Sequence, residues 1–332
     1  MSGHPPPKTA LITGVAGQDG SYLAEFLLSK GYVVHGLVRG SSSYAAGRIE
    51  HLRTDVHDDT ARFFLHHGDM ADGSRLITLL QSIRPDEVYN LAATSDVSLS
   101  FTEPELTGMT SGISATRLLE AIRMIGLPTR YYQASSSAMF GDARGPQDEM
   151  TPLKPLSPYG AAKGYAYWMT RNYRQSYGLF AVNGIAFNHE SPRRDESFVT
   201  RKIAMGAAAI AAGKQDFLYL GNIEAARDWG YAREYVQGMW AMLQADKPGD
   251  YVLATGTSHT VRDFLHFCFD SVGLDWGRYV VFDERYLRPT EVDSLVGDAS
   301  KAERELGWKA TVLAPELARI MTEAEVRVLR GS

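Results

Sequence analysis

Short apolar runs alternate with segments of helical spacing along the first half of the chain. In the first unit, the apolar run Thr9–Thr13 enters a glycine-rich turn, and the apolar residues of Ser21–Lys30 then fall on one helical face. Gly31 ends this segment, and Tyr32–Val38 forms a second apolar run. This order of strand, turn, helix and strand within about 30 residues predicts a βαβ unit.

The same alternation continues as far as Phe187. Further strands are predicted at Arg62–His67, Glu87–Ala92, Thr129–Ala134 and Ala181–Phe187, and further helices at Ser74–Ile83, at Ser114–Ile125 and around Tyr159 and Lys163. Strands buried on both faces of a parallel sheet are mostly apolar, as the first run Thr9–Thr13 is. The pattern therefore predicts an α/β fold built on a doubly wound parallel sheet of the Rossmann type.

Beyond Asn188 the alternation weakens. A loop leading into an amphipathic helix is predicted over Ser191–Lys202, and strands are predicted at Asp216–Gly221 and Asp250–Thr255, with a helix at Ala232–Leu243 between them. A chain of 332 residues also exceeds the roughly 250–300 residues that one hydrophobic core supports. We therefore expect a nucleotide-binding domain over residues 1–187, to which residues of about 228–257 return, and a smaller interleaved lobe formed mainly by residues 188–332.

Composition and charge narrow the class of protein. The formal net charge is -5, which gives no electrostatic reason to expect a nucleic-acid partner. No stretch approaches the roughly 18 uninterrupted apolar residues of a membrane span, so no membrane partner is expected. The single cysteine, Cys268, is typical of a reducing compartment and is predicted to be buried in a helix. We therefore predict a cytoplasmic protein.

The glycine-rich turn indicates a dinucleotide site. Gly14, Gly17 and Gly20 are spaced i, i+3 and i+6 between the first strand and the first helix. This spacing lets the backbone approach a pyrophosphate at the N-terminus of a helix. Gln18 and Asp19 lie inside the turn and are candidate cofactor contacts as well.

The end of the second strand bears on the choice of cofactor. An acidic residue at this place would bind a ribose 2′-hydroxyl, whereas an arginine suits a 2′-phosphate. Here the place is taken by Arg39, followed by Gly40 and three serines, and charge-assisted bonds from these groups favour NADP, with NAD as the alternative. A solvated loop arginine is the competing interpretation. Asp69 is either an adenine contact or a turn residue, and Met70 and Leu91 are further candidate cofactor contacts.

Tyr159 and Lys163 are the candidate catalytic pair. They lie four residues apart in Ser157–Lys163, which places them one turn apart on one helical face. A neighbouring ammonium favours phenolate, so the phenol can ionise below its usual pKa of about 10 and accept a proton from an alcohol. Ser136, at the end of a predicted strand, can share the same substrate hydroxyl. An ordinary helix and a serine-rich turn are the competing interpretations.

Taken together, these residues resemble the extended short-chain dehydrogenase/reductases that modify nucleotide sugars, and most closely the GDP-mannose 4,6-dehydratase family. The resemblance rests on Thr13–Leu28, Ser157–Lys163, Phe187–Arg194, Phe198–Ile203, Arg227–Gly230 and Leu287–Asp293. It implies an NADP-bearing Rossmann domain and a small lobe that binds a GDP-sugar. It also implies Ser136, Tyr159 and Lys163 as the catalytic set, and a homo-oligomer, either dimer or tetramer.

The same match implies the substrate contacts. The implied contacts to the nucleotide diphosphate and the sugar are Asn188, Val199, Lys202, Arg227, Arg288 and Glu291. The three cations among the implied contacts suit two phosphates. A surface charge is the competing interpretation for each of them.

One position departs from the family pattern. The family has a glutamate two residues after its catalytic serine or threonine, where it removes the C5 proton during water loss, and this chain has Ala138 there. Losing a positioned general base costs about 10²- to 10⁴-fold in rate. Nucleotide-sugar 4-epimerases also carry an alanine at this place and need no base at C5. The expected reaction is therefore reversible oxidation of a GDP-hexose at C4, leading to C4 epimerisation or another non-dehydrating step.

Three alternatives remain open at this point. The first is a working 4,6-dehydratase that forms GDP-4-keto-6-deoxymannose with a substitute base, for which Asp96 is the candidate. The second is a reductase of a 4-keto GDP-sugar. The third is a binding protein without turnover, against which stands the retention of both Tyr159 and Lys163. The nine histidines show no ligand spacing that would indicate a metal site.

Overall fold

A seven-stranded parallel sheet forms the larger lobe of the computed structural model, which describes residues 6–40, 45–53, 60–286, 292 and 294–331. The strand order is β11-β6-β5-β4-β1-β2-β3. The strands are β1 (Thr9–Thr13), β2 (Val33–Val38), β3 (Phe63–His67), β4 (Glu87–Asn90), β5 (Arg130–Ser136), β6 (Ala181–Ala186) and β11 (Asp250–Leu253). All neighbouring pairs are parallel. The predicted doubly wound α/β fold is confirmed.

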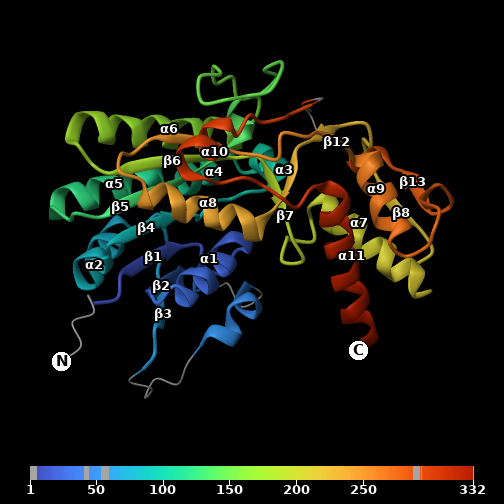
Figure 1. Cartoon of the computed structure of the whole chain (residues 1–332), viewed down its shortest axis with the longest axis horizontal. Coiled ribbons are helices and arrows are strands. Elements are labelled where there is room, and N and C mark those ends of the chain that lie inside the picture. The colour runs from blue at the N-terminus through green and yellow to red at the C-terminus, as the bar shows by residue number, and fades with distance from the viewer. Residues whose placement is uncertain (1–5, 41–44, 54–59, 287–291, 293, 332) are drawn as a thin grey trace.

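Helices cover both faces of this sheet (Figure 1). One face is covered by α1 (Gln18–Ser29) and α8 (Ala232–Gln244), which bury residues such as Leu23 and Val236. The other face is covered by α2 (Gly73–Ile83), α5 (Ser114–Ile125) and α6 (Pro158–Tyr177), which bury residues such as Leu79 and Leu118. The amphipathic spacing in the sequence reflects these two apolar cores.

The smaller lobe lies beside the sheet lobe and has its own core (Figure 1). Its helices are α7 (Val199–Ala211), α9 (Val261–Asp270) and α11 (Ala314–Gly331), and its parallel strand pair is β8 (Leu218–Leu220) with β13 (Val280–Phe282). Cys268 is fully buried in α9, as predicted. The predicted strand Asp250–Thr255, by contrast, is β11 at the edge of the large sheet, beside β6.

Shorter elements connect the two lobes. Two strand pairs are β7 (Asn188–Glu190) with β10 (Trp229–Tyr231), and β9 (Ala226–Arg227) with β12 (His259–Thr260).

The remaining α-helices are α3 (Val97–Thr102), α4 (Pro104–Thr107) and α10 (Ser300–Leu306), and Gly108–Ile113 forms a π-helical stretch between α4 and α5. The 3-10 turns are Ala45–Arg48, Glu50–Leu52, Ser137–Met139, Trp276–Arg278 and Glu284–Tyr286. Within the described residues, no helix has the length and apolar character needed to cross a membrane.

The strand order fixes where a ligand can bind. The chain starts in the middle of the sheet at β1, goes outward to β2 and β3, and then returns to the other side of β1 at β4. In such sheets the crevice at the reversal point, outside the carboxyl ends of the strands, takes the ligand. Gly14, Arg39 and Leu91 all follow the carboxyl ends of strands around this reversal.

Candidate active site

A cavity of about 580 Å³ opens at the carboxyl ends of the strands of the large sheet. Its volume falls within the range of small-molecule sites, roughly 300–1,000 Å³. Its wall includes the glycine turn, the end of β5, the first turns of α6, and Asn188 and Arg227 from the connecting strands. Residues far apart in the sequence therefore meet around one space.

The glycine turn leaves no room for side chains at two of its positions. Gly14 has φ +68°, and a Cβ there would lie 3.0 Å from the Ala92 Cα atom at the end of β4. A Cβ on Gly20 would lie 2.4 Å from the Gly14 carbonyl oxygen. Glycine is therefore required for the first turn of α1 to pack against the sheet. This close packing leaves the N-terminus of α1 facing the cavity, where its N–H groups suit an anion.

Ser136 is the last residue of β5, and its hydroxyl oxygen accepts a hydrogen bond from the Ala138 N–H at 3.2 Å. The strand extends two residues beyond its predicted end, so Ser135 and Ser136 belong to the strand and not to a serine-rich turn. Ser136 and Ala138 both line the cavity. Position 138 therefore faces the space in which a sugar would react.

The start of α6 positions Tyr159 and Lys163. The Ser157 hydroxyl oxygen caps the helix by accepting from the Gly160 N–H at 3.1 Å, and Pro158 is the first helical residue. A Cβ on Gly160 would lie 2.5 Å from the Ala138 carbonyl oxygen. Gly160 thus lets the catalytic helix approach the turn after Ser136.

Lys163 is buried, and its ammonium donates to the Ala134 carbonyl at 2.8 Å. The Nζ atom lies 5.7 Å from the centre of the Tyr159 ring. Burial lowers the pKa of Lys163 to about 8.

The pKa of Tyr159 differs from the expectation. Burial raises it, although a hydrogen bond from Ser136 and the charge of Arg194 act in the opposite direction. The prediction of a lowered phenol pKa in the free protein is therefore wrong, because desolvation of the phenolate outweighs the favourable neighbours.

The structure brings most of the predicted site residues together. The predicted residues that line the cavity are Gly14, Gly17, Gln18, Asp19, Gly20, Arg39, Asp69, Met70, Leu91, Ser136, Tyr159, Lys163, Asn188 and Arg227. Val199 and Lys202 are not among the lining residues; Lys202 instead lies with its Nζ 3.4 Å from the centre of the Tyr286 ring. Arg288, Glu291 and the three serines after Gly40 lie outside the described residues.

Asp96 does not lie where a substitute base is needed. Its carboxylate accepts from the Ser98 N–H at 2.7 Å and the Leu99 N–H at 3.2 Å, and so caps α3. Its sequence neighbours Ser95 and Val97 line the cavity, while Asp96 does not. This placement gives no support to Asp96 as the acceptor of the C5 proton.

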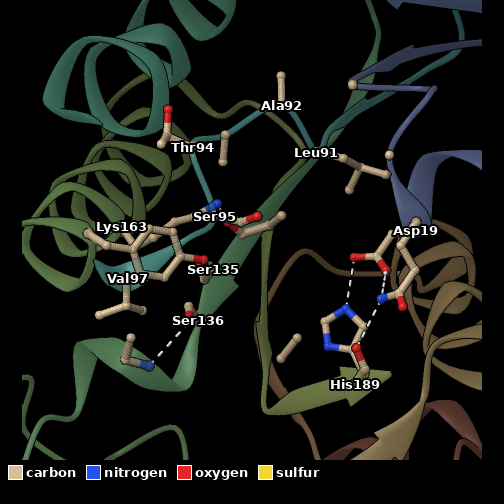
Figure 2. A pocket seen from close by; sticks show the side chains of 18 of the residues that line it. Asp19, Leu91, Ala92, Thr94, Ser95, Val97, Ser135, Ser136, Lys163 and His189 are labelled. Atoms are coloured by element: carbon tan, nitrogen blue, oxygen red, sulfur yellow. Dashed lines mark hydrogen bonds and ion pairs between the residues drawn. The ribbon is translucent and has the colours of Figure 1, made fainter. Parts of the chain in front are cut away.

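Sequence reasoning did not name His189 and Arg194 as contacts of the cavity. His189 and Arg194 both line it, and both stand inside the stretch Phe187–Arg194 that carries the family resemblance. Because this stretch matches the family, the sequence could have marked both residues as candidate contacts. Thr94 and Thr110 also line the cavity, with their hydroxyl oxygens 3.1 Å apart. Figure 2 shows His189 beside Asp19, across the pocket from Ser136.

Comparisons with known proteins place this cavity in context. The family model described as GDP-mannose 4,6 dehydratase matches residues 11–321. A GDP-mannose 4,6-dehydratase of Sinorhizobium fredii is 53% identical, with 98% of this chain and 98% of that protein covered. GDP-mannose 4,6 dehydratase 1 of Arabidopsis thaliana is also 53% identical, with 98% and 91% covered. The solved UDP-glucose 4-epimerase of Thermus thermophilus in complex with NAD has a TM-score of 0.80 and 25% identity, with 96% and 98% covered.

These relatives overturn the expectation of C4 epimerisation. Proteins that are 53% identical over nearly the whole chain carry the name of a dehydratase, whereas the epimerase is 25% identical. The epimerase prediction depended on Ala138 in place of the family's glutamate, beside an intact set of Ser136, Tyr159 and Lys163. One missing carboxylate slows a proton transfer, but the sugar and nucleotide contacts that determine the substrate are spread over many residues.

Proposed function

Because the chain belongs to the GDP-mannose 4,6-dehydratase family, we propose that it removes water from GDP-mannose and forms GDP-4-keto-6-deoxymannose. The observation that carries the proposal is the meeting of Ser136, Tyr159 and Lys163 with the glycine turn around one cavity. The non-dehydrating reductase and the binding protein without turnover have no comparable support.

We propose NADP as the cofactor, with NAD as the alternative. The glycine cradle at Gly14 and Gly20, which a Cβ would fill, fits a dinucleotide diphosphate. Arg39 lines the same cavity at the end of β2, where a guanidinium suits a 2′-phosphate. Asp69, Met70 and Leu91 would contact the remainder of the dinucleotide. When bound, the nicotinamide supplies an acceptor and a donor for hydride.

Tyr159 acts on the C4 hydroxyl in this proposal. Its phenol oxygen takes the hydroxyl proton, Ser136 orients that hydroxyl by a hydrogen bond, and the Lys163 ammonium favours the phenolate. Lys163 is held for this role by its bond to the Ala134 carbonyl. Asn188 and Arg227, on the opposite wall, are the proposed contacts to the GDP-sugar. Val199, Lys202, Arg288 and Glu291 remain predicted substrate contacts.

The elimination step is the one that this chain supports least. The C5 proton must leave without a carboxylate at position 138. Water, as the acceptor, is poorer than a positioned carboxylate. We therefore expect water loss, not oxidation at C4, to limit turnover.

The test is the fate of deuterium in C4-deuterated GDP-mannose, incubated with the protein and NADP. Dehydration lowers the product mass by one water and moves the label to C6, since hydride taken from C4 returns there. A product of unchanged mass that keeps the label at C4 would overturn the proposal. The Tyr159→Phe variant is the control for the chemistry, because it keeps the cavity wall and loses the proton acceptor.

The division of labour between the lobes is also a proposal. Residues 1–187 would hold the cofactor, with residues of about 228–257 returning to that domain, and residues 188–332 would mainly hold the GDP-sugar. The place of β11 in the large sheet and the packing of α8 on α1 support the returning segment. The separate core beneath α7, α9 and α11 supports the second lobe.

We further propose a homo-oligomer. Met124 of α5 and Tyr165, Trp168 and Tyr177 of α6 are exposed apolar side chains on neighbouring helices. Large exposed apolar side chains on two packed helices support an interaction surface there. The cytoplasmic location indicated by the single cysteine stays a prediction.

A further inference from the structure

His189 makes contacts through both nitrogens of its ring. The Nε2 atom lies 2.8 Å from the Asp19 Oδ2 atom (Figure 2). The Nδ1 atom lies 2.7 Å from the Phe187 carbonyl oxygen. Both partners are oxygen atoms that only accept hydrogen bonds when Asp19 is ionised. A neutral imidazole carries one N–H and can satisfy one of them, whereas an imidazolium satisfies both. The geometry therefore fits a protonated His189.

The surroundings of the Asp19–His189 pair are mixed in charge. Tyr235 of α8 stacks on the imidazole, with ring centres 4.7 Å apart and an angle of 16°. Gln18 donates to the Asp19 carboxylate, and the Arg194 charge acts on both members of the pair. The Asp19 charge also acts on Tyr132 of β5 and on Tyr159 and Lys163 of α6.

The two pKa shifts agree in direction with the geometry. Burial alone would lower the pKa of His189, but the charge and the hydrogen bond of Asp19 outweigh it, and the net shift is upward. Burial would likewise raise the pKa of Asp19, and His189 outweighs it, so the net shift is downward. The folded pair is thus a carboxylate next to an imidazolium.

Asp19 lies where its charge can affect the binding of phosphates at the glycine turn. Asp19 belongs to the first turn of α1, inside the glycine turn that is proposed to receive the cofactor diphosphate. An unbalanced carboxylate at this place would repel the phosphates, which the N-terminus of a helix otherwise attracts. The imidazolium of His189, supplied by β7 next to the glycine turn, balances that charge.

We propose that His189 must be protonated for tight binding of the dinucleotide, because its charge neutralises Asp19 beside the diphosphate. Loss of this proton leaves the Asp19 carboxylate uncompensated and weakens the affinity of the site. The inference rests on the proposed function, since it takes a nicotinamide dinucleotide as the ligand. The pair is a positioning device for the cofactor and takes no part in the proton transfers at the sugar.

The direction of the His189 pKa shift determines how the affinity for the dinucleotide changes with pH. The His189 pKa is raised in the folded protein, so the balanced form is present at lower pH and is lost as pH rises through the raised value. Dinucleotide phosphates next to the pair favour the protonated form further. Binding therefore takes up a proton, and affinity falls on the alkaline side.

The first measurement is the dissociation constant of NADPH, from its fluorescence, between about pH 7 and about pH 9, above the ordinary range of histidine. We expect the wild-type affinity to fall about tenfold across this range, the equivalent of a one-unit pKa difference between the free and bound forms. The His189→Gln variant keeps a charged Asp19 and should bind weakly at every pH. The double variant Asp19→Asn/His189→Gln should bind more tightly than His189→Gln and lose the alkaline fall.

Lys163 also titrates near this range, since its pKa is about 8. The Asp19 charge acts on this pKa. His189→Gln keeps both Asp19 and Lys163, so only the part of the pH dependence that disappears in His189→Gln and in the double variant alike belongs to the pair. The matched control is His266→Gln, which breaks an exposed His266–Asp270 pair of α9 outside the cavity. This control should keep the wild-type pH dependence.

The second measurement needs no cofactor. Nitrogen NMR of the wild-type protein should show both nitrogens of the His189 ring protonated at neutral pH, and Asp19→Asn should shift the ring toward the neutral form. A neutral His189 in the wild type would overturn the inference, as would an unchanged alkaline fall in the double variant. If the wild type binds neither NADPH nor NADH at any pH, the proposed function fails together with the inference; binding without the pair-dependent fall overturns the inference alone.

Discussion

The buried ammonium of Lys163 and the phenol of Tyr159, the proposed catalytic pair, both line the cavity. Burial disfavours the charged form of both groups. It therefore lowers the pKa of Lys163 and raises the pKa of Tyr159. A phenol in this state is a weak proton acceptor. The charge on Lys163 therefore has to be kept for Tyr159 to act at neutral pH.

The pH dependence of activity should reveal this charge. Because burial lowers the pKa of Lys163 to about 8, the ammonium loses its proton as pH rises through that value. We expect kcat/KM for GDP-mannose to fall above about pH 8. The Lys163→Arg variant keeps its charge to much higher pH, so its lower activity should not show the same fall. An identical alkaline limb in this variant would assign the fall to another group.

Ala138 is the position at which a longer side chain is expected to raise the rate of water loss. It lines the cavity next to Ser136, and a carboxylate there would lie where the family has its elimination base. We expect Ala138→Glu to raise the rate of water loss by about 10²-fold or more, measured as product mass against time. Ala138→Gln has nearly the same shape without the charge and should give no such gain. Equal rates for the two variants would show that elimination does not limit turnover.

At the scale of elements, α6 and the turn after β5 determine how closely the catalytic groups approach. Gly160 and Gly164 stand one turn apart on α6. A Cβ on Gly160 would meet the Ala138 carbonyl oxygen at 2.5 Å, whereas a Cβ on Gly164 would meet nothing within 4 Å. Two similar positions of one helix therefore differ in what they tolerate.

The pair Gly160→Ala and Gly164→Ala tests this difference. Gly164→Ala should be neutral or should stabilise the fold by up to about 1 kcal/mol, since alanine is the better helix former. Gly160→Ala should cost about 1–3 kcal/mol as the helix and the turn are forced apart. It should also lower kcat, because Tyr159 moves away from Ser136. Thermal unfolding and steady-state kinetics of both variants check the expectation; equal effects would contradict it.

At the scale of the whole molecule, Asp228 ties the two lobes together. This fully buried carboxylate accepts from the Thr255 N–H at 2.9 Å and hydroxyl at 2.7 Å, from the Gly256 N–H at 2.9 Å and from the Gly297 N–H at 3.2 Å. It follows directly on Arg227, a proposed contact to the GDP-sugar. The network thus joins the loop after β11 to the substrate wall of the cavity.

Replacing Asp228 by Asn should loosen this connection. An amide nitrogen cannot accept from these donors, and we expect a loss of roughly 1.5–3 kcal/mol in unfolding free energy. The KM for GDP-mannose should rise as well, because the segment with Arg227 is no longer held. The control is Asp298→Asn, which changes an exposed carboxylate that accepts from the Ser300 N–H. That variant should keep its KM, and a similar rise there would argue against the proposed role of Asp228.

Local patterns in the sequence were enough to predict the features that depend on neighbouring residues. The alternation of apolar runs predicted the parallel sheet, the three glycines predicted the turn before α1, and the four-residue spacing put Tyr159 and Lys163 on one face of α6. These predictions succeed because strand burial and helical periodicity act over a few residues. The family match likewise rests on contiguous stretches, so it too was visible without a structure.

Features that depend on burial and on contacts between distant residues could be seen only in the folded chain. Asp19 and His189 are 170 residues apart in the chain, and only the packing of β7 against the glycine turn pairs them. Asp96 was a candidate base by its chemistry, but its carboxylate is used to cap α3. The upward shift of the Tyr159 pKa depends on desolvation by the surrounding fold, which no local pattern records.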